Sequence, residues 1–181
     1  SLGTAAANRK IVVVTATRSA GGTVTNPTLT VASNSATLTK GNNAATGTNS
    51  TTIFELDLAS GSTANLVVTY SENTARCGAS VYAVYGAGGV ASDTDESDTN
   101  GGSVTLTVPA KGVAIAGTIT TGTASTCTWT GLTHDHSSTV ESNVFHSTGH
   151  LNSNAGGNIS MNGSWSSSTT APPSVFASWG P

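Results

Sequence analysis

Hydrophobic residues recur at every second position along most of the chain, which is the period of a β-strand with one buried face. In the segment 51–58, Phe54, Leu56 and Leu58 share one face, and the segment 103–108 shows the same alternation. No stretch of ten or more residues repeats its apolar side chains with the 3.6-residue period of a helix. The other candidate strands cover residues 11–16, 28–31, 36–39, 65–70, 80–85, 113–119, 126–130, 140–146, 158–161 and 174–179.

Clusters of Gly, Asn, Ser and Asp separate these runs and supply the turns that short strands need. The composition agrees, because only 8% of the 181 residues are charged while Thr, Val, Ser and Gly are abundant. We therefore expect an all-β protein, an antiparallel, jelly-roll-like β-sandwich of about ten or more short strands. Since we find no internal repeat and no clear linker, residues 1–181 are expected to form a single domain, with Gly117 marking a bulge.

Charge and hydropathy argue against two classes of partner. Six Lys and Arg residues against nine Asp and Glu residues give a net charge of -3, too little positive charge for a track of phosphates. The only local group of basic residues, Arg9, Lys10 and Arg18, fits a solvated strand end. No apolar run approaches the roughly 20 residues of a membrane-spanning helix, so neither nucleic acid nor a membrane is an expected partner.

Two cysteines, Cys77 and Cys127, lie within predicted strands. A disulfide between them and a pair of free thiols are both compatible with the sequence, since pairing cannot be read from spacing. We favour free thiols, because a buried cysteine in a strand behaves as a small hydrophobic residue.

The sequence gives little support for catalysis. It has no Gly-x-Ser-x-Gly turn to present a nucleophilic serine. Glu55, Glu72 and Glu96 are expected on strand faces or in loops rather than as a positioned pair of acids. We expect that the protein is not an enzyme.

Several segments of the chain form a familiar combination. They are Leu-Gly-Thr-Ala-Ala-Ala-Asn-Arg-Lys at 2–10 running into the strand 11–14, Val-Val-Thr-Tyr-Ser at 67–71, Arg-Cys-Gly at 76–78, Val-Tyr-Ala-Val-Tyr-Gly at 81–86, Trp-Thr-Gly-Leu at 129–132 and Phe-Ala-Ser-Trp-Gly at 176–180. Together they resemble a loosely defined group of virion structural proteins of tailed bacteriophages and prophages. The similarity spans most of the chain except the polar stretch 137–170.

This resemblance implies a β-sandwich module on the surface of a virion, in the head or the tail. The leading hypothesis is a capsid decoration or cement protein that binds the major capsid protein or other virion proteins as a homo-oligomer, with a trimer as the expected state. The alternative is a carbohydrate-binding or receptor-binding module of a fibre or spike, whose ligand would be a host surface glycan. In that group the Leu-Gly-Thr-Ala start often follows further sequence, so a fragment or a processed chain is one interpretation of Ser1.

The four histidines all lie within residues 134–150. His134 and His136 would share one face of a regular strand, and Glu141 follows five positions after His136, as in the metal motif of cupins. The polar residues around this pair favour a different interpretation, namely a solvated or interface cluster of histidines. Both interpretations stay open, and no cofactor is required.

Four carboxylates lie close together in the segment 93–98, where Asp93, Asp95 and Asp98 could hold Ca²⁺ through oxygen ligands. Their order does not match an EF-hand, and we favour a solvated hairpin loop over a calcium site.

Trp165 lies in a strongly polar segment, where an exposed indole could stack on a sugar ring or contact another subunit. Ordinary local packing of the indole is the third interpretation, and all three stay open. Trp129 and Trp179 alternate with small residues along predicted strands, so we expect both in the core.

Overall fold

The computed structural model describes residues 1–43, 48–123, 125–141, 143–168 and 171–181. Within these ranges it contains fifteen β-strands and no helix. The first seven strands are β1 (Arg9–Ser19), β2 (Thr28–Val31), β3 (Asn34–Ser35), β4 (Thr37–Asn43), β5 (Asn49–Asp57), β6 (Leu66–Thr69) and β7 (Thr74–Tyr85). The next eight are β8 (Asp93–Ser97), β9 (Val104–Val108), β10 (Gly112–Thr121), β11 (Cys127–Thr130), β12 (Thr133–Glu141), β13 (Val144–Ser153), β14 (Gly157–Trp165) and β15 (Ser174–Trp179).

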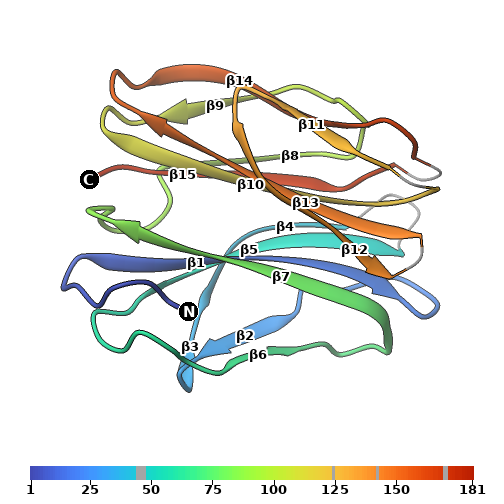
Figure 1. The fold of residues 1–181 in the computed structure, drawn as a ribbon, viewed down its shortest axis with the longest axis horizontal. Helices are drawn as coiled ribbons and strands as arrows, with labels where there is room; N and C mark the ends of the chain where they lie inside the picture. Colours follow the sequence, from blue (N-terminus) through green and yellow to red (C-terminus); the bar gives the residue numbers. More distant parts are fainter. Residues whose placement is uncertain (44–47, 124, 142, 169–170) are drawn as a thin grey trace.

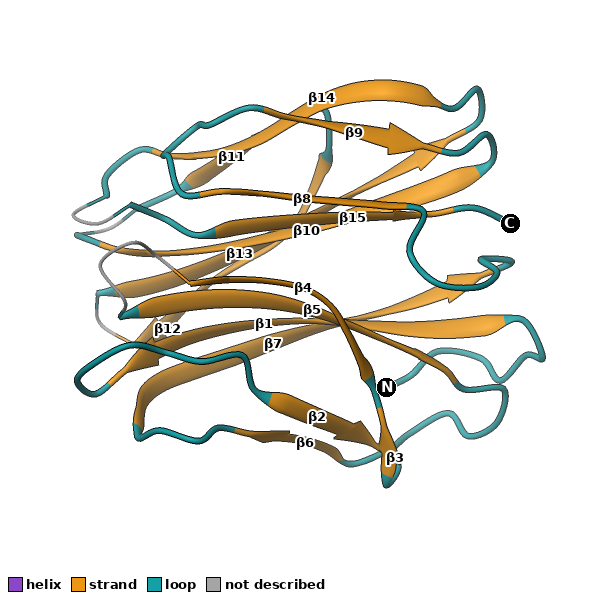
Figure 2. Cartoon of the chain, turned by 180° about the vertical axis from the view of Figure 1, so that it is seen from behind, coloured by secondary structure: helices purple, strands orange, loops and turns teal. Residues whose placement is uncertain are grey.

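The strands form four antiparallel sheets that stack as four layers, visible from the front in Figure 1 and from behind in Figure 2. From the bottom of Figure 1 upward, the layers are β3-β2-β6, β4-β5-β1-β7, β12-β13-β10-β15-β8 and β11-β14-β9. The expected class, an all-β antiparallel sandwich with more than ten strands, is confirmed. A jelly-roll connectivity stays a prediction.

A separate apolar cluster fills each of the three spaces between layers. Leu29 and Phe54 lie in the cluster between the lower two sheets. Ile115 and Trp179 belong to the central cluster, where the two large sheets face each other, and Leu106 belongs to the upper one. Because the large sheets are covered on both faces, their central strands β1 and β10 are buried along almost their whole length, as expected for two-sided strands.

The two halves of the chain repeat one strand arrangement that the sequence did not reveal. The sheet order β4-β5-β1-β7 in the first half matches β12-β13-β10-β15 in the second, strand for strand in chain order. The pair β2–β6 in the lowest layer matches the pair β11–β14 in the highest. The molecule is therefore built from two similar sandwiches, which share the central core.

The two halves differ at one flank, where the sheet edges are covered in the second half and uncovered in the first. In the second half, β8 pairs with β15 and β9 pairs with β14, so these two strands close the edge of both sheets. No described strand pairs with the outer edge of β7 or β6, which are the counterparts of β15 and β14. The first sandwich is open at the flank where the second is closed.

Two sequence interpretations of local features are wrong. Gly117 marks no bulge, because the ladder from β10 to both neighbours runs through it without a shift. A Cβ at this position would lie 2.2 Å from Cγ1 of Val14 in the facing sheet, so close packing between layers explains the glycine. Arg9 and Lys10 do not lie at a solvated strand end, since both side chains are buried in β1.

Candidate functional site

His134 and His136 do lie on a strand, β12, but they do not share a face. The register of β12 against β13 shifts between them, so that Asp135 is an inserted residue, as in a β-bulge. His134 lies opposite Gly149, which packs against Trp129 of β11 on the side of the sheet that faces the β11-β14-β9 layer. One residue further along β13, Thr148 is the partner of His136, so His136 faces the other side.

The metal ligands suggested by the sequence therefore do not converge. Nε2 of His134 hydrogen-bonds to the Ser137 hydroxyl at 2.8 Å, and the Glu141 carboxylate forms an ion pair with Arg76 of β7. Among the described residues, no group of three or more His, Cys, Asp or Glu side chains could hold a metal ion. The cupin-like interpretation is wrong because the bulge at Asp135 breaks the alternation on which it depended.

The acidic segment is also different from the expected loop. Asp93 and Asp95 belong to β8, an edge strand, and only Asp98 follows it in the turn. Asp93 accepts hydrogen bonds from its neighbour Thr94 and from the backbone N–H of Thr107, at 2.9 and 2.7 Å. An extended backbone separates these carboxylates instead of wrapping them around one point, so they do not form a calcium site.

The three tryptophans are all buried. Trp165 is only 2% exposed, and its Nε1–H donates to the Thr118 hydroxyl at 3.2 Å. Of the three interpretations of Trp165, local packing is confirmed, and an exposed indole for glycan stacking or subunit contact is not present, because the ring packs inward while its polar neighbours on β14 are more exposed. Trp129 and Trp179 are core residues as predicted.

Both cysteines are free thiols, as favoured from the sequence. Cys77 is exposed on β7, whereas Cys127 is buried on β11. Burial raises the pKa of the Cys127 thiol to about 11, which keeps it protonated and unreactive at neutral pH.

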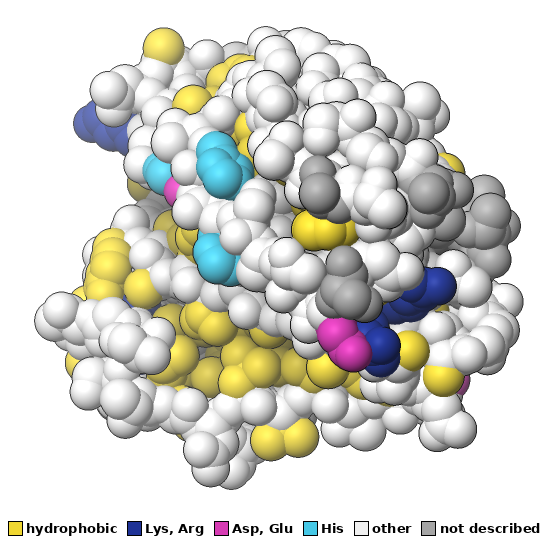
Figure 3. Space-filling view, turned by 45° about the vertical axis from the view of Figure 1, so that its right-hand side comes forward, with side chains coloured by type: hydrophobic (Ala, Val, Ile, Leu, Met, Phe, Trp, Pro, Cys, Tyr) yellow, Lys and Arg dark blue, Asp and Glu magenta, His cyan; other side chains and the backbone are white. Residues whose placement is uncertain are grey.

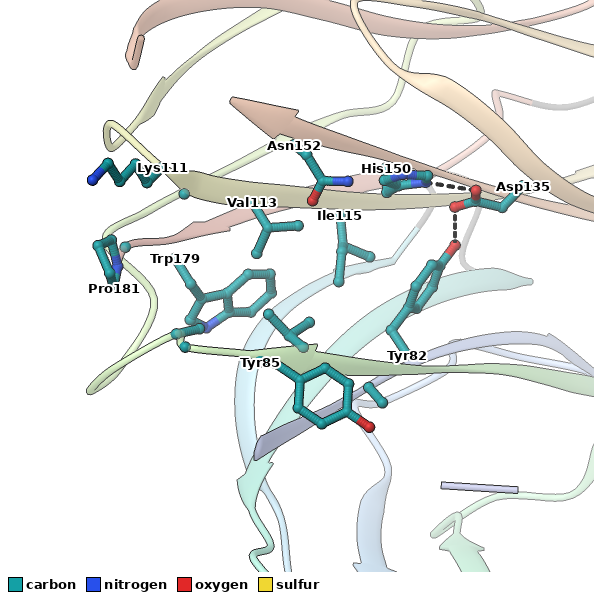
Figure 4. A pocket seen from close by; sticks show the side chains of 16 residues that line it. Tyr82, Tyr85, Lys111, Val113, Ile115, Asp135, His150, Asn152, Trp179 and Pro181 are labelled. Atoms are coloured by element: carbon teal, nitrogen blue, oxygen red, sulfur yellow. Dashed lines mark hydrogen bonds and ion pairs between the residues drawn. The ribbon is translucent and has the colours of Figure 1, made fainter. Parts of the chain in front are cut away.

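A groove of about 440 Å³ opens between the two large sheets, beside the C-terminal end of β7. Figure 4 shows Tyr82 of β7 pointing toward the side that carries His150 and Asn152 of β13, whereas the ring of Tyr85 points away from them. The indole of Trp179 lies between the two sides. We call this feature the interlayer groove.

A hydrogen-bonded network crosses the interlayer groove. The Tyr82 hydroxyl donates to Oδ2 of Asp135 at 2.8 Å, and Nδ1 of His150 lies 2.6 Å from Oδ1 of the same carboxylate (Figure 4). Desolvation raises the pKa of Tyr82, and the neighbouring Asp135 carboxylate raises it further, so the phenol remains a hydrogen-bond donor. The β-bulge is what turns the Asp135 side chain toward the groove.

Buried charges support the floor of the interlayer groove. Trp179 donates its Nε1–H to the Glu55 carboxylate, which lies 3.5 Å from the ammonium group of Lys10. Lys10 also pairs with Asp57 at 2.7 Å. These contacts fix the indole in the floor, and the side chains of Asp135, His150 and Asn152 supply a carboxylate, an imidazole and an amide to the lining.

Sequence reasoning missed the residues of this groove. Tyr82 and Asp135 belong to strands that pair with different partners, and only the stacking of the two large sheets brings them together. The available signal was Tyr82 in the apolar segment 80–85, since a tyrosine packed between sheets needs a partner for its hydroxyl.

A second surface of interest is the open flank of the first sandwich, formed by the outer edges of β7 and β6. Between them lies a hollow of about 360 Å³, lined by Val68, Tyr70, Thr74, Cys77, Gly78 and Ala79. Val81 and Val67 on the same two strands are among the most exposed large hydrophobic residues. Figure 3 shows apolar side chains gathered in a hollow in the lower half of the molecule, beneath the histidines.

Comparisons of the chain with protein-family models, with curated proteins and with solved structures found no match. Among the described residues there is also no helix long and apolar enough to cross a membrane.

Proposed function

We propose that the protein is a non-enzymatic structural protein of a tailed-phage virion, which attaches to the capsid shell and stabilises it as a decoration or cement protein. The resemblance of segments such as 67–71 and 176–180 to virion proteins supports this role. The observation that carries the proposal is the open flank, because an exposed apolar edge of this kind is typical of a protein-binding surface.

The contrast between two equivalent strands makes the open flank unusual. Every residue of β15 is buried, whereas none of the twelve residues of β7 is. A long, uncovered edge strand with apolar side chains can pair with other chains and aggregate, so in free proteins such an edge is normally covered or carries charged residues. In a shell-bound protein the neighbouring subunits would cover it.

Two measurements test the proposal. Cryo-EM of intact purified particles should show copies of the protein spread over the shell. Adding the purified protein to shells that lack it should raise the temperature at which the shells disrupt. Copies confined to a tail tip or a vertex, together with no shift in the disruption temperature, would contradict the decoration role.

The interlayer groove favours a second candidate, binding of a host surface glycan by a fibre or spike. Tyr82 lines this groove, and an aromatic ring beside a carboxylate and an amide is the combination that sugar-binding sites use. Asp135 and Asn152 supply those polar groups. Under this proposal, glycan affinity is lost in Tyr82→Ala and Asp135→Asn but kept in Trp165→Phe, because Trp165 is buried in a different layer.

A further inference from the structure

In the second sandwich, strands of the chain itself cover the flank that is open in the first. These covering strands indicate what kind of segment the open flank can bind. The consecutive strands β8 and β9 lie in neighbouring layers of the second sandwich, where β8 pairs with the edge of β15 and β9 pairs with the edge of β14. They do not pair with each other, and we call this pair of edge strands the ribbon. Val104, Leu106 and Val108 alternate along β9, and all three enter the upper apolar cluster. The ribbon therefore seals a sandwich by main-chain pairing and by apolar side chains at every second position.

Polar contacts fasten this ribbon to the sheet. The Ser178 hydroxyl of β15 donates to the Thr107 carbonyl of β9 at 2.7 Å. Within the ribbon, the Asp93 carboxylate accepts from the Thr107 N–H at 2.7 Å. The side chain of Glu96 on β8 pairs with Lys40 of β4 at 3.1 Å, so the ribbon also contacts the other large sheet. It is an integral part of the second sandwich.

From this internal counterpart we infer that the open flank binds two consecutive extended strands of a separate chain, one pairing with β7 and the other with β6, which place alternating apolar side chains in the hollow beside Cys77. The inference rests on the proposed function only in treating the flank as the attachment surface. It adds the kind of partner, a ribbon that completes the first sandwich as β8 and β9 complete the second.

Three features of the flank fit such an occupant. The edge of β7 is twelve residues long and has no proline, so its main-chain groups can pair with an added strand. The hollow between β7 and β6 is lined mainly by small or apolar side chains, with Val68 and Ala79 among them. Arg76, the only charged residue of β7, is already paired with Glu141 of β12.

The rate at which a reagent labels the Cys77 thiol tests this inference, because Cys77 is exposed and lines the hollow that the partner would cover. The other thiol, Cys127, is buried and has a raised pKa, so a thiol reagent such as Ellman's reagent should label Cys77 alone. A Cys77→Ser variant checks that assignment, since its labelling should disappear.

The test fuses a second copy of residues 92–108 to the full chain ahead of Ser1, through a flexible Gly/Ser linker. Tethering gives the added ribbon an effective concentration in the millimolar range, so that weak pairing is still detected. We expect labelling of Cys77 to slow at least about tenfold, with slower hydrogen exchange of the β7 amides. The matched control carries Ser at the positions of Val104, Leu106 and Val108 in the added copy only, and should label as fast as the unfused chain.

Equal labelling rates in the fusion, its serine control and the unfused chain would overturn the inference. So would a fall in Cys77 labelling of the unfused chain with rising protein concentration, accompanied by a dimer in sedimentation, because a second copy would then occupy the flank. Neither result depends on where the protein lies on a particle, so failure of the ribbon and failure of the virion role are distinguishable.

Discussion

Arg9 is a charged side chain that is almost completely buried at the start of β1. Its Nε–H and Nη2–H groups donate to the carbonyls of Leu58 and Ser60, each at 2.8 Å, and Nη1–H donates to the Leu2 carbonyl at 3.1 Å. The planar guanidinium thus holds the N-terminal segment and the turn after β5 together.

Replacing this guanidinium with an ammonium group tests its role. Arg9→Lys keeps the charge but cannot reach several carbonyls at once, so we expect the free energy of unfolding in urea to fall by about 2–4 kcal/mol. Arg18→Lys, at a partly exposed position of the same strand, should change it by less than about 0.5–1 kcal/mol. Equal effects of the two changes would show that the buried hydrogen bonds contribute little.

His146 is buried in β13, and its Nε2 has no hydrogen-bond partner among the described residues. Desolvation, helped by the nearby His136, lowers the pKa of His146 to about 4. The unfolded chain binds a proton near pH 6.5, well above the folded pKa, so protonation favours unfolding. The contribution of neutral His146 is therefore fully present above pH 6.5 and is lost as the pH falls toward 4.

A comparison of variants isolates this contribution from the titration of carboxylates. The stability difference between the wild-type protein and His146→Leu, measured by urea unfolding, should shift against the wild type by about 3 kcal/mol between pH 7 and pH 4. A difference that stays constant over this range would mean that the imidazole is solvated in the folded protein.

At the scale of elements, the strands were the most predictable part of the molecule. The alternation of Val104, Leu106 and Val108 predicted β9 with its buried face, since that signal depends only on neighbouring residues. The bulge at Asp135 was not predictable, because it depends on how β12 is registered against β13. The predicted shared face of His134 and His136 was wrong, and the groove at Tyr82 was missed, for the same reason. Both depend on which strands become neighbours in the fold.

The contrast between a closed and an open flank gives a prediction for two matched substitutions. Val108→Ala in β9 removes two methyl groups from a fully buried site and should lower the free energy of unfolding by about 2–3 kcal/mol. Val81→Ala in β7 makes the same change at a side chain that is 39% exposed, and should cost less than about 1 kcal/mol. Chemical denaturation of each variant measures the change in its free energy of unfolding relative to the wild-type protein. If Val81→Ala proves as costly as Val108→Ala, the flank is closed in the free protein.

At the scale of the whole molecule, the two sandwiches share the central core instead of meeting across a linker. Val12 and Val14 of the first half pack with Ile115, Val175 and Trp179 of the second. Because neither half can bury its large sheet alone, we expect them to unfold in one cooperative transition. The repeated strand order escaped sequence reasoning because it lies in which strands pair, whereas the turns and motifs of the two halves differ.

Gly117 tests this coupling, since it faces Val14 across the space between the two large sheets. In Gly117→Ala the added Cβ would lie 2.2 Å from Cγ1 of Val14, so the sheets must separate locally, at a cost of about 1–3 kcal/mol. Gly21→Ala is the matched control, because a Cβ there meets no atom within 4 Å. Calorimetry should show one transition at a lower Tm for Gly117→Ala and little change for Gly21→Ala. If Gly117→Ala instead split the transition in two, the halves would be independent folding units, and the shared core would serve only to dock them.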